Sequence, residues 1–309
     1  MNLEKEIRDG YEISADMKKI WAVEMELLKK LLEVCERHHL KIWAEGGTLL
    51  GAVRHHGYIP WDDDIDMAMP REDYDKLQVI AKDEFKAPFF FQSGYTDLFP
   101  NGMTRLRMDG TAAILPQSVF QECHQGIFID IFPLDVIPDN HQELMTFLEE
   151  RDNEKEKLKL YCESHLSLSN LKHNWNIFKI KREINKIGYN SYFKKYDQIV
   201  KQFANSDFKR VSIFSWSPQS KYYRNREWYH NTVYLQFEDI KMPVPADYDS
   251  ILTKQFGDYM KPVKEPTMHG GFVILDPEKS YKYYLPLLRK EHRWDHWKTK
   301  IPLLVDKFK

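Results

Sequence analysis

An acidic stretch followed by an alternating apolar pattern constrains this chain most. In WDDDIDMAM, residues 61–69, Asp64 and Asp66 flank Ile65, and methionines continue at every second position. Side chains of a β-strand alternate between its two faces, so this pattern predicts both carboxylates on one face and buried apolar residues on the other. Close carboxylates repel each other, and a hard divalent cation offsets that repulsion with oxygen ligands. The apolar register argues against the alternative, a solvated acidic turn. We therefore expect a metal site at Asp64 and Asp66.

A glycine pair lies shortly before the acidic stretch. Residues 40–45 favour a short strand and residues 48–56 a helix, with Gly46 and Gly47 between them. Glycine lets a ligand approach the main chain closely. The free N–H groups of a helix N-terminus attract phosphate, so we expect Gly47 and Thr48 to form a phosphate site.

Composition narrows the function classes. The chain has 309 residues, 42% hydrophobic, with a net charge of −2, which suits a folded core and gives no reason to expect nucleic acid. Its three cysteines, Cys35, Cys123 and Cys162, show no CxxC spacing, which favours a reducing compartment over a disulfide framework or a zinc site. No apolar run approaches the roughly 18 residues of a membrane span. The first residues lack a signal-like apolar segment, so we expect a cytoplasmic protein.

A basic strand is predicted at residues 103–108, where Arg105 and Arg107 share one face. Asp109-Gly110 then predicts a hairpin turn, with residues 111–115 as the returning strand. A planar guanidinium grips a diphosphate with two hydrogen bonds, so both arginines are candidates for donor binding. The alternative is a pair of cross-strand surface charges.

A second carboxylate-bearing strand is predicted at residues 127–132. Asp130 is the one charge among five apolar residues. A buried carboxylate is costly without compensation, so such a residue usually meets a cation or a network of donors.

Three segments together resemble the LicD family of phosphotransferases, which includes the fukutin-related proteins. They are GGTLLGAVRHHGYIPWDDDID (46–66), HQGIFIDIFPLD (124–135) and FEDIKMPVPADYDSILTKQFGDYM (237–260). More distantly, the glycine turn and Asp-x-Asp resemble the nucleotidyltransferase superfamily of DNA polymerase β. The resemblance implies an α+β fold, in which a mixed β-sheet is flanked by helices and a helical subdomain is inserted. It also implies Mg²⁺ or Mn²⁺ at the Asp-x-Asp and a CDP-linked donor.

The resemblance assigns roles to four aspartates. Asp64 and Asp66 match the metal-binding pair, and Asp62 matches a further aspartate that ligates the metal or supports the ligands. Asp130 matches a third carboxylate, which serves either as a metal ligand or as the base that takes the proton of the attacking hydroxyl.

Donor-binding residues are carried over in the same way. Gly46, Gly47 and Thr48 match the turn that approaches the phosphates. Arg54, in the helix motif, is expected to face either the donor phosphates or solvent. His269 is a donor-binding candidate, although KPVKEPTMHGG (261–271) departs in detail from the family pattern.

The chain is expected to divide into three parts. Residues 1–140 would form the nucleotidyltransferase-like core, 141–226 a helical subdomain, and 227–309 a part that completes the core. The basic amphipathic tail, residues 293–309, would dock onto the body or contact the inner face of a membrane, and we favour docking.

The resemblance implies transfer of phosphocholine from CDP-choline to a hydroxyl of a glycan or lipid-linked glycan acceptor, as in teichoic acid, lipopolysaccharide or capsule. Aromatic faces bind a quaternary ammonium, and Trp43, Tyr58 and Trp61 lie near the acidic stretch, but core packing explains them equally well. The alternatives are another CDP-linked group (phosphoethanolamine, ribitol phosphate or glycerol phosphate), nucleotidyl transfer to a small molecule, a glycosyltransferase, and a catalytically silent nucleotide-binding module.

Overall fold

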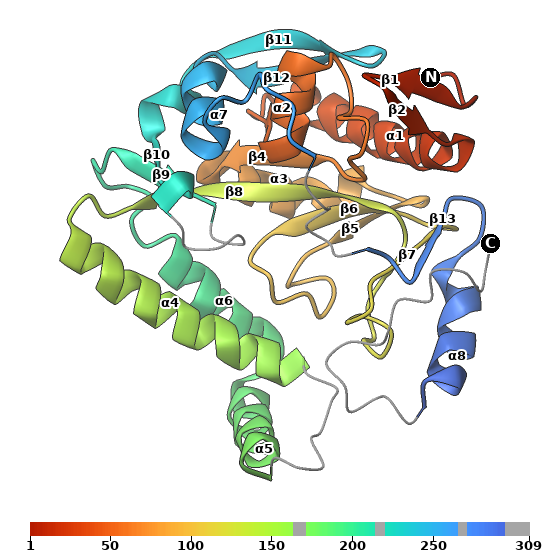
Figure 1. The fold of residues 1–309 in the computed structure, drawn as a ribbon. Helices are drawn as coiled ribbons and strands as arrows, with labels where there is room; N and C mark the ends of the chain where they lie inside the picture. The colour runs from red at the N-terminus through yellow and green to blue at the C-terminus, as the bar shows by residue number, and fades with distance from the viewer. Residues whose placement is uncertain (163–170, 214–219, 265–270, 294–309) are drawn as a thin grey trace.

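The computed structural model describes residues 1–162, 171–213, 220–264 and 271–293. Its fold is α+β, as expected, with helices packed around a mixed β-sheet (Figure 1). The strands of the main sheet are β3 (Trp43–Ala44), β4 (Asp66–Pro70), β5 (Phe89–Gln92), β6 (Thr104–Met108), β8 (Phe128–Ile137), β9 (Arg210–Ser212) and β10 (Arg224–Asn225).

Strand β8 organises this sheet. It is buried along its whole length, which suits its run of branched and aromatic residues. On one side it pairs with β4 in parallel, and on the other it pairs antiparallel with β6 near its start and with β9 near its end. The parallel pairing places Asp66 directly beside Asp130.

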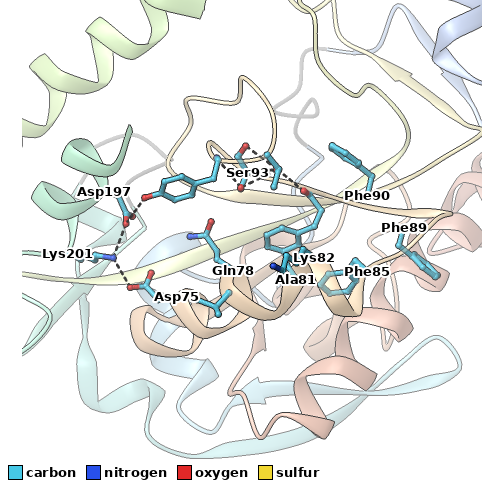
Figure 2. A pocket seen from close by; sticks show the side chains of 14 residues that line it. Asp75, Gln78, Ala81, Lys82, Phe85, Phe89, Phe90, Ser93, Asp197 and Lys201 are labelled. Carbon is cyan, nitrogen blue, oxygen red and sulfur yellow. Dashed lines mark hydrogen bonds and ion pairs between the residues drawn. The ribbon is translucent and has the colours of Figure 1, made fainter. Parts of the chain in front are cut away.

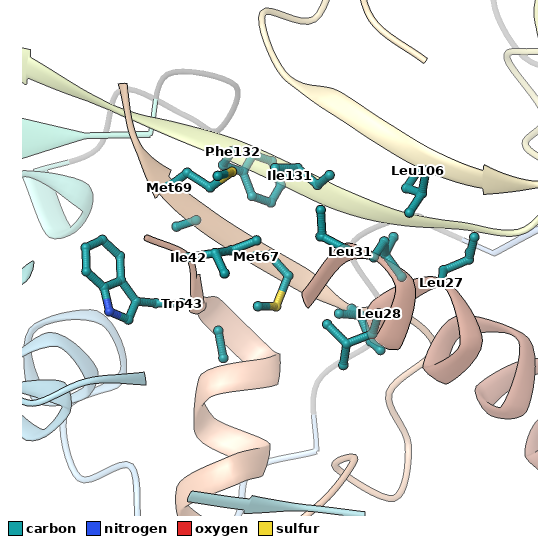
Figure 3. Packing of buried hydrophobic residues seen from close by; sticks show 14 of the residues in the cluster. Leu27, Leu28, Leu31, Ile42, Trp43, Met67, Met69, Leu106, Ile131 and Phe132 are labelled. Atoms are coloured by element: carbon teal, nitrogen blue, oxygen red, sulfur yellow. The ribbon is translucent and has the colours of Figure 1, made fainter. Parts of the chain in front are cut away.

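Helix α1 (Ala15–Arg37) covers one face of the sheet. Its N-cap is Ser14, whose Oγ accepts a hydrogen bond from the Met17 N–H. Leucines of α1, among them Leu27 and Leu31, pack toward Met67 and Leu106 (Figure 3). Ile65, Met67 and Met69 are fully buried, so the predicted apolar register is confirmed.

The remaining elements surround this core. In the N-terminal half they are β1 (Glu6–Arg8), β2 (Tyr11–Ile13), α2 (Gly46–Arg54), α3 (Arg71–Glu84) and β7 (Ala112–Ile114). Toward the C-terminus they are η1 (Ser220–Tyr222), η2 (Arg226–Tyr229), β11 (Thr232–Phe237), β12 (Ile240–Pro245), α7 (Tyr248–Phe256), β13 (Ile274–Asp276) and α8 (Tyr281–Glu291). In the described ranges, no helix combines the length and the apolar composition of a membrane span.

A second hydrophobic cluster lies among three helices, α4 (His141–Cys162), α5 (Leu171–Ile187) and α6 (Tyr189–Val200). The segment that supplies these helices also supplies β9 and β10, which extend the main sheet. The expected three-part division of the chain stays a prediction.

The predicted hairpin at Asp109-Gly110 is wrong. Strand β7 pairs with β13 and not with β6. Both edges of β6 are already taken, by β5 on one side and by β8 on the other, so no edge is left for a returning strand.

Candidate active site

One cavity of about 580 Å³ gathers most of the predicted site residues. Its wall includes Gly46, Gly47, Arg54, Asp62, Asp64, Asp66, Arg105 and Asp130. A separate hollow of about 470 Å³ lies beside α3 and β5, with Phe85, Phe89 and Phe90 in its wall (Figure 2). That hollow contains none of the predicted residues. The first cavity, called the acidic cavity below, is therefore the candidate active site.

The acidic stretch enters the acidic cavity as a loop and only then becomes a strand. β4 begins at Asp66, later than the sequence predicts, so Asp64 belongs to the preceding loop. Sheet pairing nevertheless reaches back one residue, because the Asp130 N–H donates to the Ile65 carbonyl at 2.9 Å. The Asp66 N–H donates to Thr48 Oγ1 at 2.8 Å, which ties the start of the strand to α2.

The carboxylates are close enough to strain one another electrostatically. Oxygens of Asp62, Asp63 and Asp64 lie within 4.8 Å of each other. Burial and the Asp64 carboxylate raise the pKa of Asp62 well above its ordinary value. Burial, Asp64 and Asp130 raise the pKa of Asp66 in the same way. Hard oxygen ligands in a partly enclosed acidic cavity fit Mg²⁺ or Mn²⁺, which would remove this strain.

Asp130 and Arg105 form an ion pair at the cavity wall. Arg105 Nε donates to Asp130 Oδ1 at 2.6 Å and its Nη2 to Oδ2 at 3.3 Å. The guanidinium carbon also lies 3.9 Å from the centroid of the Phe128 ring. Asp130 therefore lies beside Asp66 and is bound by Arg105, and its role as a third carboxylate stays a prediction.

Arg107 lies outside the cavity wall. Its Nε donates to Gln92 Oε1 and its Nη1 to the Gly126 carbonyl, both at 2.6 Å. Burial and the neighbouring Arg105 lower the pKa of Arg107 to about 9. Both arginines are buried, so the alternative of cross-strand surface charges is wrong.

The glycine turn is shaped by close packing. Gly46 has a φ of +55°, a left-handed conformation that glycine adopts without steric cost. A Cβ atom on Gly47 would lie 2.6 Å from Asp62 Oδ2, so the absence of a side chain lets the acidic loop lie against α2. Thr48 is buried and holds Asp66, as described above.

The packing at Gly47 yields a testable prediction. Gly47→Ala should lower the free energy of unfolding by about 1–3 kcal/mol in a metal chelator, because the new methyl group collides with Asp62. In an Asp62→Ala background the colliding oxygen is gone, so the same substitution should cost less than half as much. Denaturant unfolding of the four proteins of this cycle measures both costs. Equal costs in the two backgrounds would contradict the packing account.

A buried ion pair that sequence reasoning missed supports the turn. Glu45 is fully buried, and its two carboxylate oxygens each lie 2.6 Å from a guanidinium nitrogen of Arg224. Glu45 Oε1 also accepts the Gly46 N–H at 3.0 Å. Burial alone would lower the pKa of Arg224, but attraction to Glu45 raises it overall. The partners are 179 residues apart, and no local pattern marks either of them.

The C-terminal part of the chain supplies another part of the cavity wall. It contributes Lys221, Tyr222, Gln255, Phe256, Asp258, Tyr259, Lys261 and Val263. Arg54 reaches this wall, because its Nη1 donates to the Tyr259 carbonyl at 2.6 Å, and burial lowers its pKa. Arg54 was expected to face either the donor phosphates or solvent, and it lines the cavity. His269 and residues 294–309 lie outside the described residues.

The three aromatic residues near the acidic stretch, Trp43, Tyr58 and Trp61, lie in different environments. Trp43 and Tyr58 are core residues, 0% and 2% exposed. Trp61 lines the acidic cavity together with Tyr222 and Tyr259. Only Trp61 of the three can therefore contact a ligand in this cavity.

The raised pKa values of Asp62 and Asp66 predict a pH dependence of stability. Their pKa is higher in the folded than in the unfolded chain, where Asp titrates near 3.8, so stability is lost as the pH rises above that value. In a chelator, wild type should therefore lose stability relative to Asp66→Asn as the pH rises above about 4. Saturating Mg²⁺ should reduce the loss. Thermal unfolding across pH, with and without Mg²⁺, measures this loss of stability. Parallel plots of stability against pH for wild type and Asp66→Asn would contradict its attribution to the raised pKa values.

Comparison with known proteins yields one matching family and three relevant relatives. Residues 39–161 match the family described as LicD/FKTN/FKRP, nucleotidyltransferase domain. The chain is 27% identical over 249 residues to the lipopolysaccharide cholinephosphotransferase LicD of Haemophilus influenzae, covering 77% of this chain and 88% of that protein. It is 46% identical over 71 residues to an uncharacterized protein of Rickettsia prowazekii, covering 23% of this chain and 24% of that protein. It is 44% identical over 48 residues to the ribitol 5-phosphate transferase FKRP of Homo sapiens, covering 16% of this chain and 10% of that protein.

Proposed function

We propose that this chain, a member of the LicD family, is a metal-dependent phosphotransferase that acts on cell-surface glycans. It would move a substituted phosphate, phosphocholine first among the candidates, from a CDP-linked donor to a glycan hydroxyl. The observation that carries this proposal is the acidic cavity itself, which combines aspartates, a glycine turn and basic side chains in a space of about 580 Å³.

Phosphocholine is the favoured group for two reasons. The relative that aligns over most of both chains is named a cholinephosphotransferase. The acidic cavity also presents the aromatic residues Trp61, Tyr222 and Tyr259, and a quaternary ammonium binds to aromatic faces. Ribitol phosphate is the second candidate, because FKRP is named a ribitol 5-phosphate transferase, but its match covers only 16% of this chain.

Metal binding is assigned to the aspartates of the acidic stretch. Asp64 and Asp66 would hold the ion, with Asp62 beside them as a further ligand or as support. A bound Mg²⁺ or Mn²⁺ supplies neutralisation of phosphate charge and a template for in-line displacement. The raised pKa values of Asp62 and Asp66 support the assignment, because these carboxylates are costly to ionise without a cation.

The other cavity residues would orient the two substrates. Main-chain N–H groups at Gly47 and the cations Arg54 and Lys221 would hold the donor phosphates, since all three residues line the cavity. Arg105 holds Asp130 beside Asp66, where the carboxylate either completes the metal site or accepts the proton of the acceptor hydroxyl.

The test is CMP release from a panel of CDP-linked donors, namely CDP-choline, CDP-ethanolamine, CDP-ribitol and CDP-glycerol. Each donor is assayed with Mg²⁺, Mn²⁺ or chelator, and thermal shift is recorded in parallel so that a missing acceptor does not hide binding. We expect metal-dependent stabilisation and CMP release with one donor, CDP-choline first. Stabilisation by nucleoside triphosphates or sugar nucleotides, with no response to any CDP-linked donor, would contradict the proposal.

A further inference from the structure

Helix α5 exposes a line of large apolar side chains. Leu171, Trp175 and Phe178 are 77%, 66% and 58% exposed. Their spacing of four and then three residues places them on one face of the helix. The Trp175 and Phe178 rings stack with centroids 5.9 Å apart, so they form one continuous apolar surface.

A line of lysines runs beside this apolar line. Lys172, Lys179 and Lys186 are exposed and follow one another at seven-residue steps, which keeps them on a single adjoining strip of the helix. The charged residues of α5 are Lys172, Lys179, Lys181, Arg182, Glu183 and Lys186. The one acidic residue among them, Glu183, lies 3.9 Å from Lys157 of α4. The outer face of α5 is therefore both apolar and strongly basic.

The opposite face of α5 packs against the rest of the protein. Ile177 and Ile184 are buried, and Ile184 belongs to the cluster that α5 shares with α4 and α6. Figure 1 shows α5 at the far end of this helical group, remote from the main sheet. Nothing in the part of the chain that the structure describes covers the face that carries Trp175.

We infer that the outer face of α5 docks on an anionic lipid bilayer. An amphipathic helix with Trp, Phe and Leu on one face and lysines beside them lies in the plane of a membrane interface, with its apolar side chains at the boundary of the acyl chains. The lysines are attracted to the negative surface potential of anionic lipids. A second copy of the chain would bring two basic faces together, which like-charge repulsion opposes. This inference concerns α5 alone and does not rest on the proposed function.

The experiment is sedimentation of the full chain with lipid vesicles. Vesicles of phosphatidylcholine alone are compared with vesicles in which about a third of the lipid is phosphatidylglycerol. We expect binding to the anionic vesicles, weakening with salt, and a blue shift of tryptophan fluorescence that is absent from Trp175→Ser.

Two variants and two matched controls locate the surface. Trp175→Ser/Phe178→Ser should weaken binding to anionic vesicles at least about tenfold, whereas Tyr234→Ser, which removes a side chain 65% exposed on β11, should not. Changing Lys172, Lys179 and Lys186 together to Gln should also weaken binding about tenfold or more. The same change at three exposed lysines elsewhere should have little effect; they are Lys41, Lys241 and Lys254.

Circular dichroism checks that each variant is folded before it is compared. Failure of the wild type to bind anionic vesicles would overturn the inference. Binding that persists unchanged in both α5 variants would also overturn it, since another part of the chain would then carry the contact. Self-association of the wild type that Trp175→Ser/Phe178→Ser abolishes, without vesicle binding, would assign the face to a second copy instead.

Discussion

Asp64→Asn is expected to lower the metal-dependent rate of CMP release about a hundredfold or more, while the protein stays folded. The substitution keeps the shape of the side chain but removes a negative charge from the acidic cavity, whose wall includes Asp64. A bound metal that neutralises phosphate charge stabilises the transition state by several kcal/mol. Each 1.36 kcal/mol of activation free energy changes the rate about tenfold. Initial rates with the responding CDP-linked donor, measured across Mg²⁺ concentrations, provide the test.

Asp63→Asn is the matched control for Asp64→Asn. Asp63 lies within 4.8 Å of Asp62 and Asp64, but it is not part of the cavity wall. We expect Asp63→Asn to keep most of the activity per folded molecule. A loss as large as that of Asp64→Asn would shift the metal site toward the cluster of Asp62, Asp63 and Asp64. Full activity of Asp64→Asn would contradict the assignment of the metal.

Arg224→Ala is expected to lower the free energy of unfolding by about 3–5 kcal/mol. Arg224 is 1% exposed, and its removal would leave the Glu45 carboxylate buried without its cation. Because Glu45 also accepts the Gly46 N–H, the glycine turn should loosen, and donor affinity should fall along with stability. Denaturant unfolding and donor titration at a temperature where the variant is folded measure the two effects.

Arg37→Ala provides the matched control for the buried pair. Arg37 lies 2.7 Å from Glu84, but its side chain is 49% exposed, so its loss should cost less than about 1 kcal/mol. Equal costs for Arg37→Ala and Arg224→Ala would contradict the argument from burial.

The local chemistry of the site could be read from the sequence because it is contiguous. The acidic stretch, its apolar register and the helix after the glycine pair each follow from a run of neighbouring residues. The strand around Asp130 was predictable for the same reason, and its parallel pairing with β4 brings Asp130 beside Asp66. The boundary of the acidic strand was less accurate: the loop that packs through Asp62 against Gly47 continues past Asp64, and the strand begins only at Asp66.

The parts that the sequence did not predict depend on long-range contacts. The pair of Glu45 and Arg224 joins residues that share no local pattern, and part of the wall of the acidic cavity comes from residues 221–263. The hairpin at Asp109-Gly110 failed because sheet topology had already paired both edges of β6. Turn propensity specifies a change of direction, but it does not determine which strand becomes the partner.

The central claim is tested most directly by determining which phosphorus of the donor is attacked. The enzyme is incubated with CDP-choline and Mg²⁺ in heavy-oxygen water, so that water replaces the acceptor in slow hydrolysis, and both products are weighed by mass spectrometry. The phosphotransferase account predicts that the heavy oxygen enters phosphocholine and that CMP stays unlabelled. Heavy oxygen in CMP would show attack at the nucleotide phosphorus, and it would contradict the account in favour of nucleotidyl transfer.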